Sequence, residues 1–244
     1  MIFHGVENLL LSQQALENEE PSPIKILQLI RKTISSRAND TALGRISSEP
    51  ESTPFKVLIS TILSARTRDS VTEQASTRLF QKYPDSKFLS KANWKSVVKL
   101  IKPVNFCYGK AKRIIEVAKH LEKEFGGNVP EKMDELLKLP GVGRKTANCV
   151  LVYALKKAAI PVDVHVHRIS NRIGLVKTKT PEETEKSLSL IYDKKHWPEI
   201  NELFVRFGQS VCTPRTPKCS ICLVNKYCNY YKTSLKEGKR GRMN

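Results

Sequence analysis

No stretch of this sequence is apolar over the roughly 18 residues that a membrane-spanning helix needs. The nearest candidate, residues 9–11, is three leucines long and is followed by Glu17, Glu19 and Glu20. Acidic residues at this place fit neither a secretory signal nor an arginine-rich transit peptide. We therefore expect a soluble, intracellular protein that does not bind membranes, with residues 1–22 as an extension that has no core of its own.

Acidic residues are scarce relative to basic ones. The chain has 24 Asp and Glu against 42 Lys and Arg, which gives a formal net charge of +18 and a pI near 9.7. An excess of this size favours a polyanionic partner, and nucleic acid is the first candidate. The alternative is a basic surface that is merely solvated. Residues 231–244 are expected to form a basic C-terminal tail.

Strand patterns are almost absent, and helical periodicity predicts an all-α fold. Thr53 and Thr180 each precede a proline, as expected of a helix cap and its first turn. Ser70 and Glu73 have the spacing of a capping box. The one alternating segment, residues 162–166, has no partner strand, so we interpret it as an extended lead-in to a helix.

Residues 139–147, Leu-Pro-Gly-Val-Gly-Arg-Lys-Thr-Ala, lie between two helical patterns. Two glycines around Val142 predict a tight turn, so about 130–156 forms helix, hairpin, helix. The NH groups of Gly141 and Gly143 can hold a phosphate oxygen at the next helix's N-terminus. Lys145 follows in the first turn of that helix. The alternative is a hairpin that only connects two helices.

Four of the six cysteines lie close together, separated by six, two and five residues: Cys212, Cys219, Cys222 and Cys228. In an intracellular protein this grouping indicates a metal site rather than disulfides. Four thiolates suit tetrahedral zinc or an iron–sulfur cluster. A single Cys-x-x-Cys pair, where zinc ribbons have two, favours the cluster. Cys107 and Cys149 are expected to be ordinary buried cysteines.

The hairpin with Lys145, Asp163 eighteen residues later, and the 6-2-5 cysteine spacing resemble the endonuclease III family of base-excision DNA glycosylases. Residues 63–69, Leu-Ser-Ala-Arg-Thr-Arg-Asp, and residues 162–165, Val-Asp-Val-His, are similar to further family signatures. The resemblance runs from about residue 25 to about residue 230.

The resemblance implies two helical lobes with a DNA cleft between them. A six-helix barrel would span 47–157. Residues 23–46 and 158–230 would form the second lobe, with a 4Fe–4S cluster bound in the loop 212–228. The partner would be double-stranded DNA with damaged bases or abasic sites, bound by a monomer.

The resemblance also implies the chemistry. Lys145 would attack the sugar of an extruded nucleotide, Asp163 would stabilise the developing charge, and β-elimination would cut the strand 3′ to an oxidised pyrimidine. A helix N-terminus in a basic, partly buried site should lower the pKa of Lys145. The alternatives are an adenine- or thymine-mismatch glycosylase, and a non-catalytic DNA-binding module. Asp163 on its own could be simply a helix cap.

Other predicted DNA contacts are less typical of the family. Arg66 stands where many members have glutamine, and Phe106 stands where leucine is common; both are expected to fill the gap left by the extruded base, although Phe106 could be a core residue. His165 is expected to be structural or to contact phosphate. Three further basic residues are candidate phosphate contacts: Arg168, Arg172 and Lys218.

Overall fold

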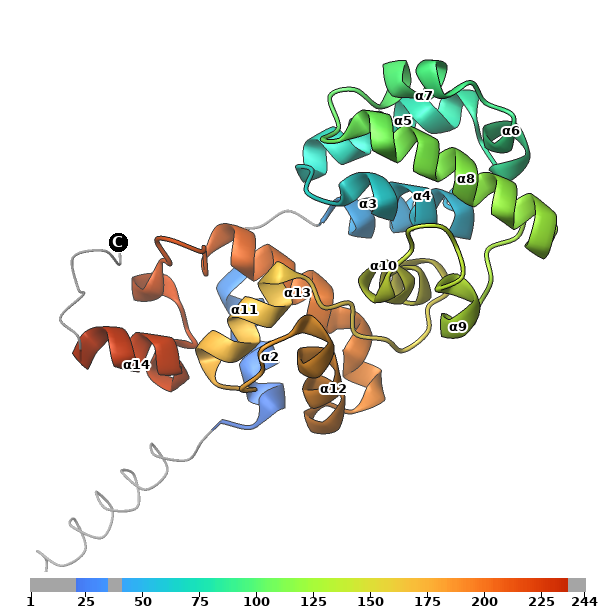
Figure 1. The fold of residues 1–244 in the computed structure, drawn as a ribbon. Coiled ribbons are helices and arrows are strands. Elements are labelled where there is room, and N and C mark those ends of the chain that lie inside the picture. The colour runs from blue at the N-terminus through green and yellow to red at the C-terminus, as the bar shows by residue number, and fades with distance from the viewer. Residues whose placement is uncertain (1–20, 35–40, 237–244) are drawn as a thin grey trace, which may run out of the picture.

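The computed structural model describes residues 21–34 and 41–236. Every regular element in these two stretches is a helix, so the all-α prediction is confirmed (Figure 1). The predicted extension 1–22 lies outside the described residues except for its last two. The predicted tail 231–244 differs, because residues up to Lys236 belong to helix α14 (Asn229–Lys236). None of the described helices combines the length and apolarity that a membrane crossing requires.

The helices form two groups, each with its own apolar core (Figure 1). In the first group, Leu58, Leu79 and Ile114 are fully buried. Its elements are α3 (Ala42–Ser48), α4 (Pro54–Ser64), α5 (Asp69–Lys82), α6 (Ser86–Ser90), α7 (Trp94–Ile101), α8 (Cys107–Phe125), α9 (Met133–Leu136), α10 (Arg144–Cys149) and a π-helical turn, η1 (Val150–Ala154).

The second group closes around Ile30, Ile169 and Phe204, all of which are fully buried. It also includes three short 3₁₀ helices and the cysteine loop. Its elements are α2 (Pro23–Ile34), α11 (Val164–Ile173), α12 (Pro181–Ile191), η2 (Lys194–His196), α13 (Trp197–Ser210), η3 (Cys219–Ile221), η4 (Asn225–Tyr227) and α14.

Helix α3 differs from the expectation that residues 23–46 belong to the second lobe. Leu43 of α3 packs in the first apolar core, whereas Ile26 and Ile34 of α2 pack in the second. The change from one core to the other therefore falls between α2 and α3.

Two of the predicted helix starts are confirmed, and one is wrong. The Thr53 side chain accepts a hydrogen bond from the Lys56 NH of α4, and the Thr180 side chain accepts one from the Glu183 NH of α12. Each threonine is followed by a proline in the first turn of its helix. The capping box of Ser70 and Glu73 does not form. Helix α5 begins at Asp69, and the Glu73 carboxylate instead makes a two-pronged ion pair with Arg45 at 2.9 Å.

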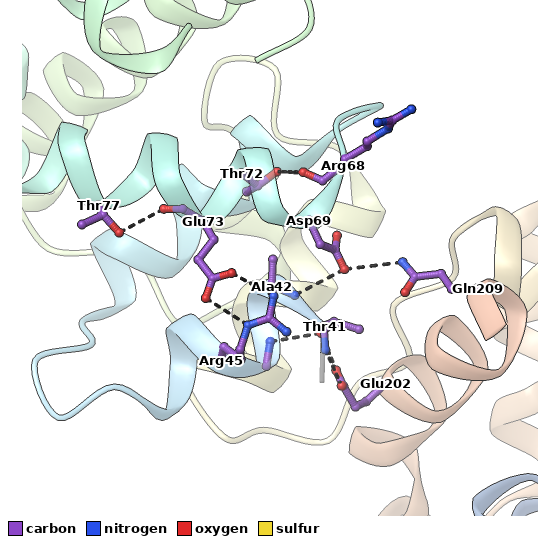
Figure 2. Close-up of polar contacts among 11 residues, drawn as sticks. Thr41, Ala42, Arg45, Arg68, Asp69, Thr72, Glu73, Thr77, Glu202 and Gln209 are labelled. Atoms are coloured by element: carbon purple, nitrogen blue, oxygen red, sulfur yellow. Dashed lines mark hydrogen bonds and ion pairs between the residues drawn. The ribbon is translucent and has the colours of Figure 1, made fainter. Parts of the chain in front are cut away.

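Polar contacts join the two groups. The Glu202 side chain of α13 accepts hydrogen bonds from the Thr41 NH and hydroxyl, at 2.9 and 2.5 Å (Figure 2). The buried Tyr153 hydroxyl lies 2.9 Å from Asn201 Oδ1 and 3.2 Å from Glu202 Oε2. Asn201 Nδ2 in turn donates to Pro161 O at 2.8 Å. These bonds hold the start of α3 and the end of η1 against α13.

We predict that Phe204→Ala lowers the free energy of unfolding by about 3–5 kcal/mol, because it leaves a cavity in the second core. Leu190→Ala is the matched control. Its side chain is 79% exposed, so the change should stay within about 0.5 kcal/mol. Chemical denaturation followed by circular dichroism measures both. Equal losses for the two variants would contradict the description of this core.

Candidate functional site

The predicted hairpin lies between α9 and α10, and its two glycines are exposed. Gly141 has φ +70°, a left-handed backbone that favours glycine. The Val142 side chain is buried in the first core, and its NH donates to Leu139 O at 3.1 Å. Within the described residues, the NH groups of Gly141 and Gly143 make no backbone hydrogen bond. The outward part of the turn is therefore made by the glycines and not by Val142.

The two glycines are needed for different reasons. A Cβ on Gly141 would lie 2.5 Å from Arg113 Nε, in addition to the strain of its positive φ. Gly143 has no positive φ, and a Cβ there would meet nothing within 4 Å. The fold does not require a glycine at 143, so its bare backbone leaves open space at the start of α10.

Lys145 lies in the first turn of α10 and is half-buried. Its ammonium is hydrogen-bonded to the Cys149 sulfur one turn later and lies near Asp163 and Asp69. Burial lowers the pKa of Lys145, but Cys149, Asp163 and Asp69 together raise it by more. The expectation of a lowered pKa is therefore wrong for the unbound protein: the acidic neighbours outweigh the helix N-terminus and the burial.

Cys149 was expected to be an ordinary core cysteine. It is buried, and burial raises the pKa of its thiol, but it is also the hydrogen-bonding partner of Lys145. The four-residue spacing puts both side chains on one face of α10. That spacing is the signal in the sequence by which this contact could have been found.

Asp163 is the N-cap of α11. Its Oδ1 accepts hydrogen bonds from the NH groups of His165 and Val166, both at 2.9 Å. The predicted extended lead-in over 162–166 is only partly confirmed: Asp163 has extended backbone, but Val164 and Val166 already belong to α11, because the Asp163 cap starts the helix at Val164. The second carboxylate oxygen makes no hydrogen bond to any described residue. Asp163 therefore caps α11 and still has one oxygen available.

Asp69 is a member of this site that sequence reasoning missed. At the start of α5, its Oδ2 lies 3.4 Å from both the Ala42 NH and Gln209 Nε2 of α13 (Figure 2). The same carboxylate contributes to the raised pKa of Lys145. Its place as the last residue of the motif 63–69 was the available signal. Asp69 thus contacts both groups of helices beside the lysine.

The loops that carry Arg66 and Phe106 lie side by side. Asn105 Nδ2 donates a hydrogen bond to Arg66 O at 2.5 Å. Both Arg66 and Phe106 have left-handed backbone, with φ of 54° and 59°. Phe106 is 67% exposed, so the alternative of a core residue is wrong. Both residues predicted to fill the gap left by the extruded base are therefore exposed, on loops that are hydrogen-bonded to each other.

His165 packs against α13. A Cβ on Gly208 would lie 2.4 Å from its Nδ1, so glycine is needed there to admit the ring. Burial lowers the pKa of His165, and Arg168 NH2 lies 3.2 Å from Nδ1. Burial of the ring therefore favours its uncharged form.

Two predicted phosphate contacts have a different role. Arg168 NH2 donates to Cys212 O at 2.9 Å, and Arg172 donates to Thr213 O at 2.8 Å and to Pro214 O at 2.7 Å. These guanidinium groups hold the beginning of the cysteine loop. Lys218 of the same loop is exposed.

All four clustered cysteines line one pocket in the second group, together with Phe207, Val224 and Tyr231. Burial, together with the neighbouring thiols, raises the pKa of Cys219 to about 11 and that of Cys222 to about 12. Four thiolates would repel one another here unless a cationic group compensated them, as a metal centre does. Among residues 21–34 and 41–236, no three such side chains converge on a point that would hold a single metal ion. The apolar pocket and its sulfur donors fit a cluster in which each iron has its own cysteine.

Comparison with protein families gives two matches. A model of the HhH-GPD superfamily of base excision DNA repair proteins matches residues 59–194. A model of the iron–sulfur binding domain of endonuclease III matches residues 212–228, from the first clustered cysteine to the last. The two matches, the glycine hairpin and the cysteine pocket define a helix-hairpin-helix DNA glycosylase with an iron–sulfur site.

Individual relatives narrow this class. Endonuclease III of Thermotoga maritima is 48% identical over 192 residues, which are 79% of this chain and 90% of that protein. Endonuclease III of Synechocystis is 35% identical and is covered to 96%. The solved structure of a trapped endonuclease III–DNA covalent intermediate has a TM-score of 0.77 at 30% identity, covering 86% of this chain and 95% of the other.

The chain belongs to the endonuclease III family. It is a bifunctional base-excision-repair DNA glycosylase and AP lyase with a 4Fe–4S cluster. The predictions of family, activity and cofactor are confirmed, and the zinc and non-catalytic alternatives are not supported. Cys212, Cys219, Cys222 and Cys228 are the residues that would hold the cluster, in the pocket beside the second apolar core.

We predict that Cys222→Ala abolishes the visible absorption of iron–sulfur charge transfer and the binding of about four iron atoms per chain. Cys107→Ala is the control, since Cys107 lies in the first apolar core. It should keep both signals. Iron analysis and absorption spectra of the purified variants measure the outcome. Retention of iron by Cys222→Ala would contradict the assignment of the pocket.

Proposed function

We propose that Lys145 is the nucleophile and that Asp163 is its acid–base partner. Lys145 Nζ would attack C1′ of the damaged nucleotide as the bond from C1′ to the base breaks. The base would leave with a proton. The C1′–O4′ bond of the sugar ring would then open, O4′ would take up the proton released from Nζ, and the opened sugar would stay attached to Lys145 as an imine. Loss of a C2′ proton would then break the bond to the 3′ phosphate oxygen, which is β-elimination. Hydrolysis of the imine would return the amine.

The electrostatics of the site support this assignment of roles. The raised pKa of Lys145 means that the unbound protein stores a proton on the amine. Attack requires a neutral amine, so this proton has to leave when substrate binds. Asp163 is the nearby base with an unused carboxylate oxygen, and it can pass a proton to or from the sugar. The same carboxylate stabilises positive charge that develops there.

We propose double-stranded DNA with damaged bases or abasic sites as the partner. A formal charge of +18 supports a polyanion. One structural relative is a non-covalent endonuclease III–DNA complex, with a TM-score of 0.77. The exposed NH groups of Gly141 and Gly143 would hold a phosphate, and open space at Gly143 would let the backbone approach it. Arg66 and Phe106 would fill the stack after the base leaves.

Oxidised or hydrated pyrimidines are the proposed lesions. The competing candidate is a mismatch glycosylase, and one observation favours it: a thermostable thymine-DNA glycosylase matches with a TM-score of 0.74 at 25% identity. Lys145 favours the lyase, because a mismatch glycosylase that only hydrolyses the bond between base and sugar needs no amine nucleophile. A panel of duplexes with one modified or mispaired base each distinguishes the two.

Lys145→Gln should abolish the borohydride-trapped enzyme–DNA adduct while duplex binding persists, because an amide cannot form an imine. Lys138→Gln, an exposed lysine just before the hairpin, is the matched control and should be trapped normally. Gel electrophoresis of the reduced mixtures measures this. Equal trapping of the Lys145 variant and the wild type would refute the assignment.

Two substitutions at Asp163 separate capping from catalysis. Asn keeps an oxygen for the NH groups of His165 and Val166, so Asp163→Asn should fold normally while base excision falls by about 10²-fold or more. Asp163→Ala should lose similar activity and, in addition, about 1 kcal/mol of stability. Single-turnover rates, DNA affinity and denaturation curves measure this. A purely structural role predicts near-normal turnover for the Asn variant.

A further inference from the structure

Two exposed residues of the first lobe have strained backbones. Arg66 lies two residues beyond α4, and Phe106 lies directly before α8; both have positive φ. Non-glycine residues adopt this conformation only where their surroundings impose it. Bonds on both sides of Arg66 come from one residue of the helix that follows Phe106.

That residue is Lys110, which lies in the first turn of α8 and is only 7% exposed. Its Nζ donates to Leu63 O at 2.7 Å, to Ala65 O at 2.6 Å and to Thr67 Oγ1 at 3.0 Å. These three bonds use all the donors of the ammonium. Two of the acceptors, at Ala65 and Thr67, flank Arg66 on both sides.

The ammonium also completes the end of α4. The last carbonyls of a helix lack intrahelical donors, and a cation at this end is favoured by the helix dipole. Lys110 thus replaces the missing donors at Leu63 and Ala65 and fixes the direction in which the chain leaves α4. This sets the position of Arg66.

The backbone of Lys110 holds the second exposed residue. Its NH donates to Phe106 O at 3.0 Å, which closes the first turn of α8. The Asn105 side chain then links the two loops through its bond to Arg66 O. One lysine and one asparagine therefore fix Arg66 and Phe106 relative to each other.

No anion explains why a lysine is buried here. Among the described residues, no carboxylate lies within ion-pair distance of Lys110. Burial lowers its pKa to about 8, which Cys107 partly opposes. An apolar side chain of similar length would fill the space without this desolvation. What the lysine adds is the set of three directed bonds to the loop.

We propose that Lys110 is a positioning residue that holds Arg66 and Phe106 as one rigid wedge, so that the space left by the extruded nucleotide is filled without first ordering two loops. This inference rests on the proposed function of those two residues. Lys110 itself does not touch the reacting atoms.

The test compares two substrates in the same duplex: one hydrated pyrimidine, which must be extruded from its pair, and a preformed abasic site, which has no base to extrude. The variants are Lys110→Met and Asn105→Ala. Asn105 is exposed, so its variant breaks only the loop-to-loop bond and keeps the test valid if Lys110→Met does not fold. Arg66→Ala and Phe106→Ala are the references. Lys112→Met changes an exposed lysine two residues later on the same helix and is the control.

We expect Lys110→Met and Asn105→Ala to slow excision of the paired lesion by about tenfold or more, and cleavage of the abasic site by less than about threefold. A 2-aminopurine opposite the lesion should show a smaller fluorescence rise on binding. Lys112→Met should match the wild type in each assay.

The inference would be overturned if Lys110→Met and Asn105→Ala kept the wild-type ratio of lesion excision rate to abasic-site cleavage rate. That ratio is also kept when both rates fall equally. If Arg66→Ala and Phe106→Ala do not lose excision of the paired lesion selectively, the proposed wedge itself is wrong. If those references lose lesion excision selectively while the Lys110 and Asn105 variants do not, the wedge stands and only the positioning role fails.

Discussion

The site depends on holding one ammonium, that of Lys145, in a half-buried position where the carboxylates of Asp163 and Asp69 act on its pKa. Each of the three starts a different helix, and the helices come from both groups. Lys145 follows the glycine hairpin in α10, Asp163 caps α11, and Asp69 begins α5. Their separation is set by the packing of the two groups and not by any one loop. The polar contacts around Glu202 and Gln209 are therefore part of what positions the chemistry.

This arrangement favours the protonated amine of Lys145 in the unbound protein. Carboxylates beside the amine favour its protonated form, and a protonated amine does not attack a sugar. In the proposed function, DNA would bring a phosphodiester to the hairpin and a sugar between the amine and Asp163, which would change the partners of that carboxylate. Since one oxygen of Asp163 stays bonded to the start of α11, the group can change its proton without losing its place.

The sequence alone could predict those features whose interacting residues are close together along the chain. The caps at Thr53 and Thr180 depend on neighbours a few residues away, and residue spacing was enough to find them. The capping box at Ser70 and Glu73 failed because α5 begins one residue earlier, at Asp69, and because Glu73 instead pairs with Arg45, which is distant in sequence.

The remaining differences have the same origin. The pKa of Lys145 depends on Asp69, and the wedge depends on bonds from Lys110 to a loop more than forty positions earlier. The four cysteines were identified by spacing as a metal site. The match to the iron–sulfur binding domain over 212–228 then decided between zinc and a cluster.

The central claim is that the lysine at the start of α10 becomes bonded to deoxyribose. Peptide mapping by mass spectrometry, after borohydride reduction of the wild-type enzyme reacting with a lesion-containing duplex, tests it most directly. The account predicts the sugar remnant on the peptide that contains Lys145, at its Nζ. A remnant on the chain's N-terminal amine or on another lysine, or no remnant at all during active turnover, would contradict it.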